Sequence, residues 1–348
     1  MIDFNAVDVE AIAFHQVGNK HHEADCYFSD RLFDGTEDEQ SLLLAYFTKP
    51  FKELTEVYRF QHHIQLSMNE LYMCAGNVFK ANDFLEESVN IVKHLYDQSE
   101  HPHIKSGEVF VVKFNNVVYQ NEMHEALGIF KAEKKEAFFN ARQQSGELQL
   151  EIDKGIHAKK LDKGCIIMNR DAEEGYHVFS VDTNRYDSEY WKERFLNITY
   201  QKDHNYQTKS FISMCKDFSK EVIETHEGKK EQVNFMNQAM GYMATQEELN
   251  PGQFASDLFA DEGSKEIFQD YQKKYVQENE EEWPERFEVS KSVLKEQKRK
   301  IKNQINLDTH IQIKLNFNNP ESAERFMEKG YDEEKGMHYY KIYFNREE

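Results

Sequence analysis

Histidines and carboxylates gather at three places in the first third of the chain, and imidazole with carboxylate is a ligand set that zinc and similar metals favour. The positions are His21, His22 and Asp25, then His62 and His63, then His101 and His103. Adjacent histidines on a strand point to opposite faces, so they cannot both reach one ion there. The spacing therefore favours surface or structural histidines. We predict no metal and no other cofactor, and a metal-dependent enzyme built on the first group stays open as a third hypothesis.

Oxygen ligands recur in the segment VDTNRYDSEYW, at Asp182, Asn184 and Asp187. A calcium loop of the EF-hand type needs further oxygens and a glycine at its sixth position, which supplies the sharp bend. Asp187 stands at that position instead. Asx turns and helix caps are the everyday use of these residue types. The segment is therefore expected to be a strand end with a capping residue before a helix that contains Trp191.

The basic run 291–302 carries six basic residues and one acidic residue, Glu296. In a helix, residues spaced by three or four share a face, and four lysines of this run follow that spacing. Such a stripe can follow a phosphate backbone. The alternative, a solvated face whose charge is offset by the acidic run 278–285, also stays open. The candidate DNA-binding residues are Lys291, Lys295, Lys298, Arg299 and Lys302.

The overall charge limits what kind of nucleic-acid binder this can be. The 348 residues include 43 Lys and Arg against 63 Asp and Glu, a formal net charge of −20. A protein that coats DNA generally presents a basic face, so the balance argues against a general coat. The phosphate loop G-x-x-x-x-G-K-[ST], G-x-G-x-x-G, H-E-x-x-H and G-x-S-x-G are absent from the sequence. The usual signatures of nucleotide, zinc-protease and hydrolase chemistry are therefore missing.

The length predicts two domains, and the composition predicts a globular cytoplasmic protein. No run approaches the ~18 apolar residues that a membrane span requires, and the N-terminus lacks the pattern of a secretory signal, so no membrane partner is predicted. In the first half, strands that follow one another through short turns should pair antiparallel, which indicates an α+β fold. The expected elements are strands over 9–17, 24–28, 126–131, 148–152, 165–168 and 176–181, helices within 37–58, 66–79 and 84–96, and a hairpin that turns at Asn115-Asn116.

The second half is expected to be mainly helical and to end in a small sheet. Apolar residues at helical spacing predict helices within 211–222, 233–243 and 252–277, followed by a strand over 309–317, a short helix from Pro320 that ends at Gly330, and a strand over 337–344. The apolar stripes of these helices fit either a core or a homodimer interface. We predict an α+β domain over 1–204 and a helical domain with C-terminal strands over 205–348, with 224–230 as the alternative boundary.

Three stretches carry a family resemblance: IAFHQV near the start, VDTNRYDSEYWKERFLNITYQKDHNYQTKSFISMCKDFSKEV in the middle, and IKLNFNNPESAERF with YYKIYF at the end. Through them the chain resembles the bacterial nucleoid-associated protein family. None of the stretches is a catalytic motif, and the resemblance assigns no binding residues. It implies a two-domain cytoplasmic protein at the nucleoid that associates with DNA or with DNA-handling proteins and has no established enzymatic activity.

Besides the hypothesis of a metal-dependent enzyme, the sequence supports two others. The first is a non-enzymatic nucleoid-associated protein whose region 291–302 contacts DNA phosphates while the rest recruits partners. The second is an acidic adaptor that binds a basic partner, such as a chromosome-processing protein, without direct DNA contact.

Overall fold

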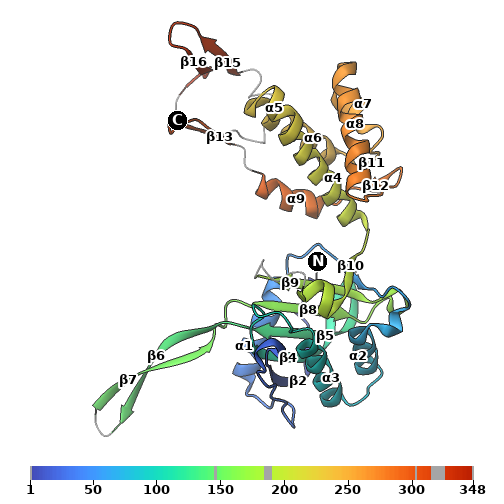
Figure 1. Ribbon diagram of the computed structural model, residues 1–348, viewed down its shortest axis with the longest axis vertical. Coiled ribbons are helices and arrows are strands. Elements are labelled where there is room, and N and C mark those ends of the chain that lie inside the picture. Colours follow the sequence, from blue (N-terminus) through green and yellow to red (C-terminus); the bar gives the residue numbers. More distant parts are fainter. Residues whose placement is uncertain (1, 145–146, 184–189, 302–303, 315–325, 347–348) are drawn as a thin grey trace. The chain divides into compact units, whose positions relative to one another are not determined.

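The computed structural model describes residues 2–144, 147–183, 190–301, 304–314 and 326–346. The chain divides into two compact units, Met1–Gln201 and Lys202–Glu348, and each is described by itself (Figure 1). The division into two independently folding domains, predicted after residue 204, stays a prediction.

The first unit is built on one antiparallel sheet of eight strands. Along the sheet the order is β1-β4-β5-β8-β9-β3-β10, and β2 also pairs with β4. The strands are β1 (Ile2–Asp3), β2 (Asp8–Val17), β3 (Tyr58–Phe60), β4 (Gly107–Tyr119), β5 (Glu122–Ala132), β8 (Lys163–Met168), β9 (His177–Asp182) and β10 (Ile198–Tyr200). The predicted α+β class with antiparallel pairing is confirmed, because every neighbouring pair in this sheet runs antiparallel.

Helices cover both faces of this sheet (Figure 1). One face packs against α2 (Glu70–Phe79), α3 (Phe84–Asp97) and a π-helical turn, η5 (Tyr190–Leu196). The other packs against α1 (Glu37–Thr48) and a 3₁₀ turn, η2 (Lys49–Phe51). Strands buried on both faces need apolar residues at every position, which explains uninterrupted runs such as VFVV in β4. Further 3₁₀ turns are η1 (Lys20–His22), η3 (Leu66–Met68) and η4 (Ala172–Glu174).

The hairpin predicted at Asn115-Asn116 is wrong. β4 runs through both asparagines, and the pairing of β4 with β5 shifts register between Phe114 and Val117. Asn116 does adopt a positive φ of 58°, but it does so at this bulge. The two-residue turn lies further on, at Gln120 and Asn121, which both have positive φ as a type I′ turn requires.

Two other expectations in the first unit need correction. No strand forms over 24–28, where a single bridge pairs Tyr27 with Gln16, because the chain before it closes into the turn η1, capped by Asn19. The helix expected within 37–58 ends at Thr48, since the turn that follows contains Pro50, which has no N–H for the helical ladder.

Strands β6 (Lys135–Gln144) and β7 (Glu147–Ile156) form a separate two-stranded sheet. The strand expected over 148–152 is therefore confirmed as part of β7, and its partner β6 was not anticipated. In Figure 1 this ribbon extends away from the eight-stranded sheet.

The second unit begins with helices around one apolar core. The elements are α4 (His204–Phe218), a π-helical turn η6 (Ser219–Ile223), α5 (Glu224–His226), α6 (Lys229–Thr245), β11 (Glu248–Leu249), α7 (Phe254–Leu258), α8 (Glu262–Glu278), β12 (Phe287–Glu288) and α9 (Lys291–Lys300). The core contains Phe211, Phe218, Met240 and Met243, so the predicted apolar stripes lie within their own unit. In the described parts of the chain, no helix is long and apolar enough to cross a membrane.

Small two-stranded sheets close the second unit, which confirms the predicted helical region with terminal strands. The pairs are β13 (Gln304–Asn306) with β14 (Gln312–Lys314) and β15 (Met327–Asp332) with β16 (Met337–Ile342). Gly330 does not end a helix, because it lies in β15 opposite Tyr339. The hairpin turn follows instead, where the Asp332 side chain accepts two backbone N–H groups and Gly336 has φ +64°. Pro320 and residues 315–317 lie outside the described residues.

Candidate nucleic-acid interface

The basic run forms α9, and its cap and apolar residues explain how it is held. The Ser290 side chain accepts a hydrogen bond from the Val293 N–H at 3.3 Å, which caps the first turn. Val293 and Leu294 are buried in the core of the second unit, where α9 packs against α4 and α6. This anchoring leaves Lys295, Lys298 and Arg299 exposed.

A hollow of about 320 Å³ lies between α6 and α9. From α6 it is lined by Asn237, Met240, Gly241 and Ala244, and from α9 by Lys291, Leu294, Lys295 and Lys298. A Cβ atom at Gly241 would meet no other atom within 4 Å, so this wall of the hollow is open. The structure thus brings three of the candidate lysines to one concave surface with an apolar floor.

The other two candidates are placed differently. Arg299 lies on α9 and is exposed, but it does not line the hollow. Lys302 lies outside the described residues.

Lys291 has a structural task at the hollow. Its Nζ donates hydrogen bonds to the carbonyl oxygen of Ala244, at 2.9 Å, and to that of Gln246. These carbonyls belong to the C-terminal end of α6, where backbone acceptors lack helical partners and a cation is favourable. Lys291 therefore joins α9 to the end of α6, whereas Lys295 and Lys298 line the hollow with exposed side chains.

The acidic neighbours of α9 reduce its charge only in part. Glu296 forms an ion pair with Lys300 one turn away in the same helix. Among the described residues, no ion pair joins Lys291, Lys295 or Arg299 to the acidic run 278–285. Part of that run has other partners: Glu278 pairs with Lys274, and Glu281 accepts a hydrogen bond from the Tyr206 hydroxyl.

Lys209 on α4 is a basic residue near α9 that sequence reasoning missed. Burial lowers the pKa of Lys209, and among its charged neighbours on α9 Glu296 raises that pKa while Lys300 lowers it. These influences place the Lys209 side chain in the electrostatic neighbourhood of α9. Lys209 stands alone in the sequence between Thr208 and Ser210. No local pattern therefore linked it to the basic run.

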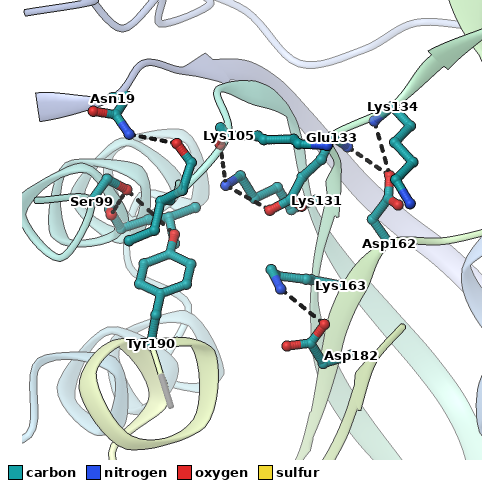
Figure 2. Close-up of polar contacts among 12 residues, drawn as sticks. Asn19, Ser99, Lys105, Lys131, Glu133, Lys134, Asp162, Lys163, Asp182 and Tyr190 are labelled. Carbon is teal, nitrogen blue, oxygen red and sulfur yellow. Dashed lines mark hydrogen bonds and ion pairs between the residues drawn. The ribbon is translucent and has the colours of Figure 1, made fainter. Parts of the chain in front are cut away.

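The lysines of the first unit's sheet show the opposite arrangement (Figure 2). Lys131 on β5 and Lys163 on β8 lie opposite each other in the sheet, and their side chains are completely buried. Lys131 Nζ lies 3.0 Å from a Glu133 oxygen, and Lys163 Nζ lies 2.8 Å from an Asp182 oxygen. Such buried, carboxylate-paired cations cannot bind an external phosphate without breaking their pairs.

Asp182, the first oxygen ligand considered for a calcium loop, has a buried carboxylate whose Oδ1 forms an ion pair with Lys163. This pairing argues against Asp182 as a calcium ligand. Asn184 and Asp187 lie outside the described residues. Trp191 lies in the π-helical turn η5, close after them, and is fully buried.

The histidine groups are held by backbone contacts. His21 and His22 lie in the turn η1, and His22 Nε2 lies 3.0 Å from the Pro102 carbonyl oxygen. His62 Nδ1 accepts a hydrogen bond from the Ile64 N–H, and His101 Nδ1 accepts one from the His103 N–H. Within the described residues, no group of three or more His, Cys, Asp or Glu side chains is arranged to hold a metal ion.

Comparison with known proteins places the chain in a lineage. A family model described as nucleoid-associated protein YejK matches residues 14–337. A search of curated proteins found no match to the chain. The matched stretch includes β3 to β5, β8 to β10 and all of α4 to α9, so it covers most of both units. The resemblance noted from the sequence is confirmed, and the chain belongs to the nucleoid-associated protein YejK family.

Proposed function

We propose that this protein acts at the bacterial nucleoid, in the cytoplasm, as a non-enzymatic protein that contacts DNA phosphates through α9. The contact is centred on Lys295, Lys298 and Arg299, and Lys302 is a further candidate from the same basic run of the sequence. The observation that carries the proposal is the hollow beside α9, which presents lysines on one concave surface. Family membership supports the location.

A local basic face can bind DNA even on a protein of net charge −20. Screening in salt limits the reach of exposed charges to about 10 Å at 0.1 M, so distant acidic residues weaken a phosphate contact only modestly. Each neutralised phosphate releases counterions, which makes such binding independent of base sequence and sensitive to salt. We therefore expect weak, non-specific binding that falls steeply as salt rises.

The test is binding of the purified full chain to a mixed-sequence DNA duplex over a salt series, compared with the double variant K295E/K298E. If both lysines contact phosphates, the variant should bind more weakly and its log–log salt slope should be shallower by about 0.9 for each lost contact. Unchanged affinity and slope would refute the site.

A matched control separates this site from the general effect of charge. The double variant K273E/K274E makes the same change in net charge on α8, where both side chains are exposed. It should bind DNA nearly as well as the unchanged protein. Equal weakening by the two double variants would mean that α9 holds no special contact.

A second candidate function, an adaptor for a basic protein partner, is favoured by another hollow in the second unit. This hollow of about 200 Å³ is lined by the acidic residues Glu227 and Glu231 and by apolar residues that include Phe218, Val222 and Ile267. Such a surface suits a lysine or arginine side chain whose apolar stem is buried. Absence of DNA binding at low salt, with capture of a lysine-rich peptide that E227K abolishes, would favour this function instead.

A further inference from the structure

The ribbon formed by β6 and β7 has no covering layer among the described residues. Its strands pair with each other and with no strand of the eight-stranded sheet. A two-stranded ribbon alone is at best marginally stable in water, and it gains stability when a further surface packs on one of its faces.

The register of the ribbon defines one apolar face. Directly opposite residues in an antiparallel pair share a face, as do alternate residues along a strand. Phe139 lies opposite Ile152 and Ala141 lies opposite Leu150, with Leu148 two residues from Leu150 on the same strand. These five residues are called the apolar face. Its four large side chains are mostly exposed: Phe139 by 73%, Leu148 by 83%, Leu150 by 67% and Ile152 by 68%.

The opposite side of the ribbon is polar and has internal partners. Asn140 donates a hydrogen bond to Asp153, and Arg142 lies 3.5 Å from Glu151 in an ion pair. Phe138 also lies on this side, against Gly155. The acidic residues and the arginine of the ribbon therefore lie on the side opposite the apolar face. Two exposed lysines, Lys154 opposite Ala137 and Lys135 opposite Ile156, lie on the same side as the apolar face, beyond its Ile152 end.

We infer that the apolar face docks against the same face of a second copy of this chain. A two-fold contact places a surface against itself, so it requires a surface that is complementary to itself. The five residues of the apolar face contain no ionisable group. Two such faces can meet over these five residues without opposing like charges within the contact, and they can exclude water from the large side chains of both copies.

Charge also distinguishes a second copy from other partners. The ribbon, residues 135–156, contains three basic and four acidic residues, so it contributes little to the net charge of −20. Two copies repel each other least when they meet at such a region. DNA would require cations across the docking face, and a strongly charged peptide would require opposite charges there. The five residues of the apolar face carry no charge, and the cations on its side of the ribbon are Lys154 and Lys135, which lie beyond its Ile152 end.

The available area indicates a reversible dimer. Each large side chain on the apolar face offers roughly 100 Å² of surface for burial, so the two faces together bury on the order of 800 Å². Stable complexes usually bury about 1,200–2,000 Å². We therefore expect monomers and dimers in a concentration-dependent equilibrium.

Sedimentation equilibrium of the full chain over a wide concentration range tests the inference, with L150E and Q149E compared. These variants place the same charge on neighbouring residues of β7, one on the apolar face and one on the polar side. The unchanged protein should dimerise, L150E should raise the dimer dissociation constant at least about tenfold, and Q149E should leave it nearly unchanged. I152S, which adds no charge, should weaken dimerisation as L150E does, and far-UV circular dichroism checks that each variant is folded.

Three results would overturn the inference: a monomer at all concentrations, a dimer insensitive to L150E and I152S, or equal weakening by L150E and Q149E. The DNA titration proposed for α9 also tests whether nucleic acid, rather than a second copy of the chain, covers the apolar face. Weaker DNA binding by L150E, with a monomeric unchanged protein, would assign the apolar face to nucleic acid instead. The inference does not depend on α9, because K295E/K298E should dimerise normally.

Discussion

Lys163 in the first unit and Lys273 in the second both lie about 3 Å from an aspartate oxygen, at 2.8 Å from Asp182 and 3.0 Å from Asp270. The Lys163 pair is almost completely buried, whereas both partners of the Lys273 pair are about three-quarters exposed. Water stabilises the exposed charges whether or not they pair, but the buried charges depend on each other. The first unit therefore buries paired lysines within its sheet, whereas the second unit keeps paired lysines such as Lys273 in contact with water.

The largest effect should come from D182N, which removes the charge that Lys163 faces inside the sheet. Breaking a buried pair from one side costs about 3–5 kcal/mol, because the remaining charge stays desolvated. The equivalent exposed change, D270N, should cost less than about 1 kcal/mol. Urea unfolding measures both, and similar losses would show that burial does not distinguish the pairs.

The two tryptophans allow the units to be followed separately in this experiment. Trp191 lies in the core of the first unit and Trp283 packs against that of the second. A W283F background reports the first unit, and a W191F background reports the second. The double change K163M/D182L should recover much of the loss caused by D182N, since it leaves no unpaired charge.

The next effect concerns pH and belongs to the first unit. His15 is buried on β2, where its Nδ1 accepts the Ser29 N–H at 3.1 Å and its Nε2 lies 2.8 Å from the Ser88 hydroxyl. Burial lowers the pKa of His15 from its ordinary 6.5, so the folded state binds this proton less readily than the unfolded state. Stability is therefore full above about pH 6.5 and decreases as the pH falls below that value.

Trp191 fluorescence in urea titrations from pH 7.5 to 5.5 measures this dependence. H15Q, which keeps a polar side chain without a titrating imidazole, should flatten it. An unchanged slope in H15Q would assign the dependence to other groups, of which His177 is the first to test because burial also lowers its pKa.

Sequence patterns predicted what depends on neighbours along the chain. The helix over 84–96 and the strands over 165–168 and 176–181 follow from local periodicity, and the structure has them as α3, β8 and β9. The lysine stripe of the basic run depended on that segment being helical, and the structure has a helix there, α9 over Lys291–Lys300. The asparagine pair at 115–116 shows the limit, because a bulge and a turn both use a residue of positive φ. Only the partner strand decides between them.

Features made by packing between distant segments could not be predicted. Asn237 and Gly241 form the hollow only because α6 lies beside α9. The alternation of Leu148, Leu150 and Ile152 predicted a strand with one apolar side, and it could not tell that no element of the described chain covers that side. Likewise, the sequence gives no sign that Lys131 and Lys163 become buried, since their carboxylate partners are recognisable only in the folded sheet.

The smallest expected effect is a difference in stability between variants of two lysines on α9, Lys291 and Lys295. K291M should lower the stability of the second unit by about 1 kcal/mol, because it removes the hydrogen bonds from Lys291 to the carbonyls of Ala244 and Gln246. K295M should change stability by less than about 0.5 kcal/mol, since Lys295 is exposed on the helix surface. In DNA titrations the order should reverse, with K295M reducing the salt slope more than K291M. Urea unfolding followed by Trp283 measures the first effect, and the duplex titration measures the second. If Lys291 dominates both measurements, α9 is a structural helix whose charges stabilise the second unit, and the contrast between buried structural lysines in the first unit and ligand-binding lysines on α9 fails.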